Sequence, residues 1–98
     1  MPLTPSADAV RKYVRTTVAA HAQMSESQLA DSMALKKPPV SLDDNKLAFL
    51  ATSLRGYVQN FNPFATVTAK DTRKDGQTVR GITDLVAGRI AGKSGAFA

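Results

Sequence analysis

Hydrophobic residues recur at the spacing of an α-helix in three separate stretches of the chain. In the first, from Pro5 to Ala22, proline follows Thr4, which predicts an N-cap and a first helical position where the missing N–H costs no hydrogen bond. The polar residues of this stretch are predicted to face away from the core: Arg11, Lys12, Arg15 and Thr16. The apolar positions are spaced by three and four residues, as one face of a helix requires: Val10, Tyr13, Val14, Val18 and, near the end, His21.

The second stretch, from Ser41 to Phe61, has the clearest helical pattern. Ser41 is predicted as the N-cap, and Asp43 and Asp44 lie in the first turn, where negative charge complements the helix dipole. We expect the chain to leave the helix at Asn62, before Pro63. The apolar residues fall on one face and predict the main core helix: Leu47, Leu50, Leu54, Tyr57, Val58 and Phe61.

The third stretch predicts a last helix from Thr78 to about residue 91. Thr78 is suited to cap it, and Gly92 and Gly95 are suited to close it. Residues 92–98 are expected to form a flexible tail. The apolar side of this helix again has helical spacing: Val79, Ile82, Leu85, Val86 and Ile90.

Two shorter segments separate the three helices. Ser25 to Gln28 matches a capping box and predicts a short helix reaching about Met33, or a turn in its place. The prolines of residues 36–39 (Lys-Lys-Pro-Pro) then end it. Residues 64–70 favour extended backbone but have no partner strand, and residues 71–76 are polar and turn-rich, which predicts a mobile loop.

These elements predict an all-α protein, a four-helix bundle of three long helices and one short helix. A chain of 98 residues fits a single domain, residues 1–98, with a core from about residue 5 to residue 91. Hydrophobic residues make up 43% of the chain, which is too many for a disordered protein. No apolar run reaches the roughly 18 residues of a membrane span, and the first residues do not resemble a secretory signal. We therefore expect a cytoplasmic protein.

The residue types exclude most catalytic chemistry. The chain has no cysteine, which removes disulfides, cysteine–zinc sites and thiol nucleophiles. His21 is the single histidine, too few for a multi-histidine metal site and without an evident catalytic partner. Its place near a helix end predicts an interaction with the last carbonyl groups. We expect a protein that is not an enzyme and binds no metal.

The chain is basic, with 13 Lys and Arg against 8 Asp and Glu, and a net charge of +5. Such a charge points to an anionic partner, although an ordinary soluble domain can also carry it. The residues best placed to contact nucleic acid are not interleaved with aromatic side chains, so the pattern disfavours that function: Arg11, Arg15, Lys70, Arg73 and Lys74.

Three segments, in order along the chain, resemble the acyl carrier protein family. Residues 10–14 are similar to the Val-Lys-Lys-Ile-Ile pattern of the family's first helix. Ser41-Leu42-Asp43 resembles the Asp-Ser-Leu-Asp stretch that opens the second helix. Residues 78–86 resemble the Thr-Val-x-x-(Ile/Leu)-x-Asp-(Leu/Tyr) start of the last helix. The resemblance extends over residues 8–91 and depends on the order and spacing of the motifs.

In that family a serine hydroxyl bears 4'-phosphopantetheine, whose thiol carries an acyl or peptidyl group. The resemblance implies that Ser41 is the attachment site and that the partners are a phosphopantetheinyl transferase and acyl-processing enzymes. It also implies that three leucines line the acyl groove or pack beneath it: Leu42, Leu47 and Leu50. A phosphodiester at a helix start is physically favourable, because free N–H groups and the positive end of the dipole face it.

Other interpretations stay open at this point. Taken alone, Ser41 is better explained as a helix cap, worth about 1 kcal/mol, than as a modified residue. Ser32 follows Asp31 and copies the family's local pattern, but the prolines at 38 and 39 leave no room for a long helix after it. The sequence therefore predicts a carrier, a divergent relative that keeps only the fold, or an interaction module that binds an acidic partner through residues 68–77 or through its basic ends.

Overall fold

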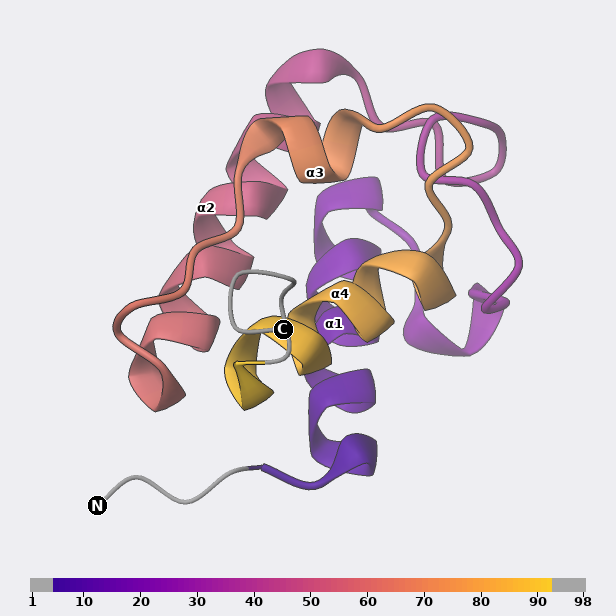
Figure 1. Cartoon of the computed structure of the whole chain (residues 1–98). Helices are drawn as coiled ribbons and strands as arrows, with labels where there is room; N and C mark the ends of the chain where they lie inside the picture. Colours follow the sequence, from indigo (N-terminus) through magenta and orange to yellow (C-terminus); the bar gives the residue numbers. More distant parts are fainter. Residues whose placement is uncertain (1–4, 93–98) are drawn as a thin grey trace.

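The computed structural model describes residues 5–92. Within this range the chain forms four α-helices: α1 (Ala7–Ala22), α2 (Asp44–Phe61), α3 (Ala69–Arg73) and α4 (Val79–Ala91) (Figure 1). A single 3-10 turn, η1 (Glu26–Gln28), lies in the long connection between α1 and α2. The described residues contain no strand, only an isolated antiparallel bridge between Ala34 and Thr78. The prediction of an all-α four-helix bundle is confirmed.

The three long helices surround one hydrophobic core. In Figure 1, α1 runs upward, α2 runs downward beside it, α4 crosses in front of α1, and α3 lies across the top. The most extensive contacts join α2 to α3 and α1 to α4. Tyr13 of α1 and Tyr57 of α2 stack at the side, with ring centroids 3.9 Å apart. The connections also contribute buried side chains to this core: Leu29, Leu35, Val40, Leu42 and Val67.

Both predicted ends of α4 are confirmed, and the predicted start of α1 is wrong. The Thr78 hydroxyl accepts from the N–H of Gly81 at 3.0 Å, and Gly92 ends α4 in the left-handed region at φ 71°. At the start of α1, however, Ser6 is the N-cap and its hydroxyl accepts from Ala9 N–H at 3.1 Å. Pro5 therefore precedes the cap. The serine hydroxyl accepts from a free N–H of the helix, and proline has no side-chain acceptor that could do so. Thr4, Gly95 and most of the predicted tail lie outside the described residues.

The connection after α1 is less helical than predicted. The capping box is present, since the Ser25 N–H donates to the Gln28 side-chain oxygen at 3.0 Å. The helical turn nevertheless ends at Gln28, and Leu29 takes an extended conformation with φ −82° and ψ 136°. Leu29 is buried in the core. The packing of this side chain therefore outweighs the tendency to continue a helix as far as Met33.

The segment predicted as a mobile loop, residues 71–76, instead contains most of α3. Asp71 accepts from the N–H of Thr68 at 2.9 Å, which forms a capping box at the helix start. The hydroxyl of Thr72 is fully buried and donates to the carbonyl of Leu47 in α2 at 2.8 Å. A five-residue helix is marginal by itself. The hydrogen bond to α2 explains why this one forms. The loop that one version of the interaction-module hypothesis used is therefore partly helical and bonded to α2, and the version that uses the basic ends stays a prediction.

Candidate functional site

Ser41 lies just before α2 but does not cap it. The N-cap is Asp43, whose carboxylate accepts from the N–H of Lys46 at 2.8 Å. Asp43 has the extended backbone that a cap requires (φ −81°, ψ 175°), whereas Ser41 is in the left-handed region at φ 46°. The prediction that Ser41 is the N-cap is therefore wrong, and α2 begins two residues later than expected.

The Ser41 backbone is held firmly while its side chain is exposed. Its N–H donates to the carbonyl of Lys37 at 2.9 Å, and the N–H of Leu42 donates to the carbonyl of Leu35 at 2.9 Å. The Leu42 side chain is buried directly after it, so the serine sits on an anchored turn. Its hydroxyl forms no hydrogen bond with any of residues 5–92. Non-glycine residues at positive φ are uncommon and are enriched at functional sites, so the exposed Ser41 hydroxyl is a candidate for such a site.

The different roles of Ser41 and Asp43 lead to a prediction about stability. We expect Asp43→Ala to lower the free energy of unfolding by about 1 kcal/mol, because a helix N–H loses its acceptor. We expect Ser41→Ala to change it by less than about 0.5 kcal/mol, since the hydroxyl has no partner. Urea unfolding of the two variants measures both values. A loss of about 1 kcal/mol for Ser41→Ala would mean that the serine is a cap after all.

Charged groups of both signs surround the start of α2, and the cations are in excess. Lys36 pairs with Asp75 at 3.1 Å, which joins the connection before α2 to the connection before α4. Arg73 at the end of α3 donates to the carbonyl of Asp44 at 2.9 Å. Two of the five cations of these segments, Lys36 and Arg73, are thus already paired with carboxylates. The other three, Lys37, Lys46 and Lys74, form no ion pair with a carboxylate of residues 5–92 and leave the region with a small net positive charge.

Arg15 of α1 fastens the long connection that leads to Ser41. Its guanidinium donates to the carboxylate of Asp31 at 2.8 Å and to the carbonyl of Leu29 at 2.8 Å. The side chain is only 11% exposed. The prediction that Arg15 faces away from the core is therefore wrong. The long aliphatic stem can lie against apolar side chains while the charged end reaches polar atoms of the connection.

The residues proposed for nucleic-acid binding are largely engaged within the protein. Arg11 pairs with Asp31 at 3.2 Å, beside Arg15, while Arg73 contacts Asp44 on another part of the molecule. Cations that are already paired with carboxylates add little attraction for phosphate groups. The structure thus does not bring the five basic residues together as one surface.

Two carboxylates in ion pairs have lowered pKa values. Burial by itself would raise the pKa of Asp31, but hydrogen bonds and positive charge from Arg11 and Arg15 outweigh it and lower the pKa below 3.8. Burial likewise opposes ionisation of Asp71, and its pKa is lowered by the N–H of Thr68 and the guanidinium of Arg89. Arg89 lies 3.3 Å from this carboxylate, so the pair joins α4 to α3.

The lowered pKa of Asp71 predicts an acid-sensitive fold. A carboxylate with a lower pKa in the folded state contributes stability above its unfolded pKa, near 3.8, and loses it as the pH falls through the folded value. We expect Asp71→Asn to be less stable than wild type at pH 7, with the difference narrowing below about pH 4. Urea unfolding between pH 7 and pH 2 measures it. A difference that stays constant over this range would contradict the prediction.

The same experiment has a matched control in Asp75→Asn. The Asp75 side chain is fully exposed and its pair with Lys36 is at the surface, so its removal is expected to change the free energy of unfolding little. An acid-dependent change as large as that of Asp71→Asn would show that general charge, not the Asp71–Arg89 pair, is responsible.

The remaining sequence candidates do not form a second site. Ser32 is exposed in a turn, and the next helix, α2, begins only at Asp44. The Nδ1 atom of His21 lies 2.8 Å from the carbonyl of Thr17, as expected for a histidine in the last turn of a helix. Leu42, Leu47 and Leu50 are all buried in the core, so they pack beneath the surface at this end of α2.

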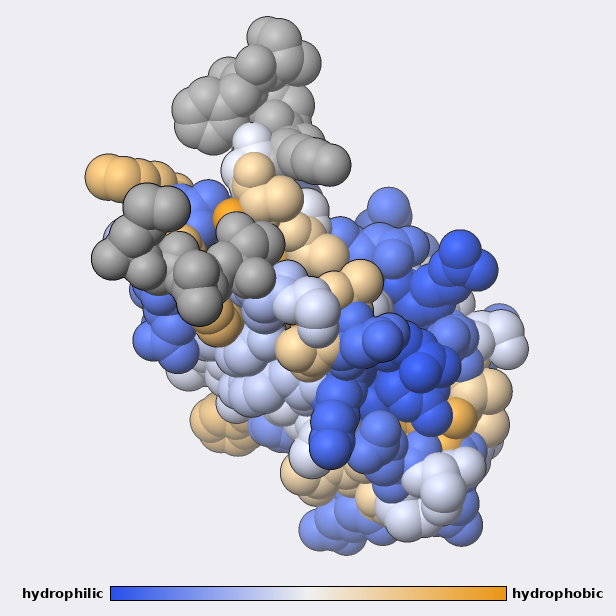
Figure 2. Space-filling view, turned by 90° about the horizontal axis from the view of Figure 1, so that it is seen from below, coloured by the Kyte–Doolittle hydropathy of each residue, from blue (hydrophilic) through white to orange (hydrophobic). Residues whose placement is uncertain are grey.

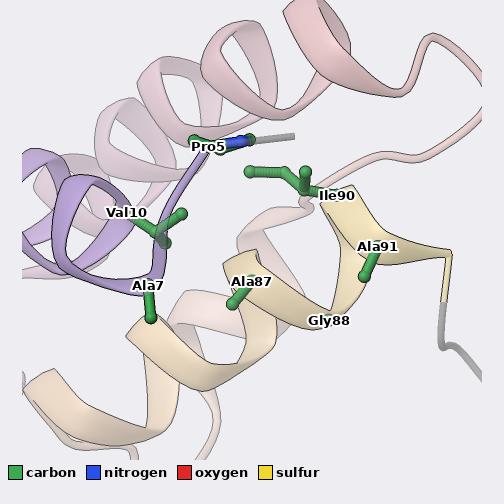
Figure 3. Close-up of a pocket in the computed structure, with 7 residues that line it drawn as sticks. All are labelled: Pro5, Ala7, Val10, Ala87, Gly88, Ile90 and Ala91. Carbon is green, nitrogen blue, oxygen red and sulfur yellow. The ribbon is translucent and has the colours of Figure 1, made fainter. Parts of the chain in front are cut away.

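One hollow lies between the start of α1 and the end of α4, away from Ser41. Ala7 and Val10 face Ala87, Gly88 and Ile90 across it (Figure 3). The hollow has only apolar side chains around it. Figure 2 shows that hydrophobic residues on the face seen from below are divided among small groups, with a large hydrophilic area between them. This face therefore presents no continuous apolar surface.

The described part of the chain also offers little for other site types. Within residues 5–92, no three side chains of His, Asp or Glu gather as metal ligands. Over the same range, every helix is too short or too polar to cross a membrane. Comparison of the chain with protein-family models, with curated protein sequences and with solved structures found no match. The functional argument therefore depends on the chain's own residues.

Proposed function

We propose that this protein is a carrier, similar to acyl carrier proteins, that bears a 4'-phosphopantetheine arm on Ser41. One observation supports it most: the Ser41 hydroxyl is exposed on an anchored turn, while Asp43 provides the helix cap. The explanation of Ser41 as a cap, which the sequence alone favoured, is thereby removed. The fixed backbone would hold the hydroxyl in one place for a modifying enzyme.

The residues around Ser41 fit the attached group. The hydroxyl oxygen would lose its proton and attack the phosphorus of a pantetheine-bearing nucleoside diphosphate, so that the phosphodiester forms and the nucleotide leaves. The positive charge of the neighbouring Lys37 would favour the negative phosphodiester. When bound, the arm would supply the thiol that carries an acyl or peptidyl group as a thioester. The protein's own contribution is to position the attachment point and to present it to partner enzymes.

The helix order gives a second line of support. The segments that carry the resemblance occupy corresponding places in the bundle: residues 10–14 lie in α1, residues 41–43 directly precede α2, and residues 78–86 open α4. Short α3 lies between α2 and α4, and its Thr72 is bonded to α2 near the end where Ser41 lies. A carrier needs no catalytic side chains, which agrees with the lone histidine and the lack of cysteine.

Intact mass spectrometry tests the proposal. The protein is co-expressed with a broad-specificity phosphopantetheinyl transferase, and its mass should rise by one phosphopantetheine. Ser41→Ala should abolish the shift, and Ser32→Ala, a matched exposed serine, should leave it unchanged. A mass that never shifts would favour the divergent relative that keeps only the fold, and a shift that survives Ser41→Ala would contradict Ser41 as the site.

A further inference from the structure

One end of the bundle carries little charge, although the whole chain has a net charge of +5. Figure 1 shows that α1 begins, α2 ends and α4 ends at the bottom of the molecule. Three described segments form this end: residues 5–9, 58–66 and 86–92. The charged residues of these segments are Asp8 and Arg89, so their net charge is zero. Two copies of a basic protein repel each other least where neutral ends meet.

At this end an aromatic ring is presented to solvent on a fixed turn. Phe64 follows α2 and is 96% exposed. Its N–H donates to the side-chain oxygen of Asn62 at 3.2 Å, and the side-chain amide of Asn62 donates to the carbonyl of Arg89 in α4 at 2.9 Å. The Gln59 side chain donates to the carbonyl of Ala65 at 3.0 Å. The ring is therefore a preformed anchor, because little backbone freedom remains to be lost when a partner binds it.

The hollow at the same end of the bundle has room for such a ring. Val10 and Ile90 are its buried members, and Ala7 and Ala91 are exposed members of its lining (Figure 3). Its volume is about 270 Å³. A protein cavity of roughly 150 Å³ lined by apolar side chains holds a benzene ring. Because the side chains around the hollow are all apolar, an inserted ring would leave none of them without a hydrogen-bond partner.

We propose that two copies of this chain associate end to end about a two-fold axis, with the Phe64 ring of each copy in the hollow of the other. The ring and the hollow lie at the same end of one molecule, so a single two-fold rotation can fill both hollows at once. The same rotation brings the two neutral ends together and keeps the cations of the two copies apart.

The area that this contact buries predicts a weak, reversible dimer. Two aromatic rings bury about 300–500 Å² of their own surface, and the walls of the two hollows lose a similar area, roughly 600–1,000 Å² in total. Stable interfaces bury about 1,200–2,000 Å². The apolar groups seen in Figure 2 are likewise small and separate. We therefore expect a monomer–dimer equilibrium with a Kd on the order of 0.1–1 mM.

The end-to-end arrangement leaves Ser41 free in both copies. Ser41 precedes α2 and Phe64 follows it, and this helix of 18 residues is about 27 Å long. An enzyme that modifies Ser41 can therefore reach it in the dimer as in the monomer. The dimer does not depend on the proposed carrier function, so either proposal can fail while the other holds.

Sedimentation equilibrium of the full chain, from about 10 μM to about 1 mM, tests the dimer. The average mass of the wild type should rise with concentration toward twice the monomer mass. Phe64→Ser should raise the Kd at least about tenfold. Phe49→Ser is the matched control, because it makes the same change at a position that is also exposed (65%), and it should keep the wild-type Kd.

Filling the hollow provides a second, independent variant. A Cβ atom added at Gly88 would meet no heavy atom of residues 5–92 within 4 Å, so Gly88→Leu should occupy the hollow without displacing its neighbours. Leucine also favours a helix more than glycine does. The variant should fold and raise the Kd as much as Phe64→Ser. Gly56→Leu is the matched control, because Gly56 is an equally open glycine within α2 and does not line the hollow.

Nuclear magnetic resonance locates the contact. In a mixture of isotope-labelled and unlabelled protein, filtered nuclear Overhauser effects should join the Phe64 ring of one copy to the methyl groups of Val10, Ala87 and Ile90 of the other. Added salt should leave the association unchanged or strengthen it, because it screens the repulsion between two copies with a net charge of +5 each.

Several results would overturn the proposal. The wild type could stay monomeric at about 1 mM, or its mass could rise beyond that of a dimer. Either Phe64→Ser or Gly88→Leu could leave the association unchanged, or the matched controls could weaken it equally. Contacts from the hollow to Leu3 or Phe97 of the same copy would mean that the chain fills its own hollow.

Discussion

Replacing Arg15 by methionine is expected to lower the free energy of unfolding by about 2–4 kcal/mol. The guanidinium donates to the carboxylate of Asp31 and to the carbonyls of Leu29 and Glu26, at 2.8, 2.8 and 3.1 Å. Methionine keeps the apolar stem but donates to none of them. The carbonyl of Leu29 is in a buried hydrogen bond, so its loss is not compensated by water.

Urea unfolding of Arg15→Met and of Arg55→Met measures this effect. Arg55 is exposed on α2, and its replacement removes the same charge, so we expect a change within about 0.5 kcal/mol. Equal effects of the two substitutions would mean that net charge, and not the fastening of the connection after α1, sets the stability. A small effect of Arg15→Met alone would mean that the connection is held by its buried apolar side chains.

Leu54→Ala is expected to lower the free energy of unfolding by about 3 kcal/mol. Leu54 is completely buried in the middle of α2, where the core receives side chains from the other long helices. The substitution removes apolar surface and leaves a cavity that close-packed neighbours fill only partly. The slope of the urea transition should stay unchanged, because the surface exposed on unfolding is nearly the same.

The matched control for this substitution is Phe49→Ala on the same helix. Phe49 is 65% exposed, so its removal leaves no cavity and should change the stability by less than about 0.5 kcal/mol. The larger side chain should therefore give the smaller effect. If Phe49→Ala were as destabilising as Leu54→Ala, the Phe49 ring would have to pack against the protein and not lie exposed.

The three long helices could be predicted from the sequence because their pattern is strong and local. The stripe from Leu47 to Phe61 has a helical period over four turns, and no alternating pattern competes with it. All of its aliphatic members are buried, as the pattern requires. Burial of one face decides the structure of such a segment, so a prediction from periodicity alone is sufficient.

The residue at which each helix starts could be predicted less well than the helix itself. Ser41 and Asp43 are both good N-cap residues and lie two positions apart, so residue type does not separate them. The backbone separates them, because Ser41 takes a left-handed conformation and Asp43 an extended one. The same ambiguity applies to Ser6 at the start of α1. A shift of the N-cap by two positions decides whether the Ser41 hydroxyl caps the helix or is left free. No local sequence signal indicates that shift.

Arg15 and α3 could not be predicted because their structure depends on distant partners. Arg15 bonds to residues 14 and 16 positions away, and Thr72 bonds to a carbonyl 25 positions away. Local propensity carries no information about such pairs. The nearest signal in the sequence is the capping box formed by Thr68 and Asp71, which marks the start of α3 but is too short to predict a stable helix.

The first turn of α4 is completed by the same connection that ends at Ser41. The N–H groups of Val79 and Arg80 donate to the carbonyls of Met33 and Asp31, at 3.0 and 2.9 Å, so the connection satisfies two amides that a helix start normally leaves to water. Whenever residues 31–35 lift away, these two amides become open to solvent. Deuterium uptake at Val79 and Arg80 thus measures how often the segment before Ser41 detaches. The measurement is made on α4, although Ser41 itself precedes α2.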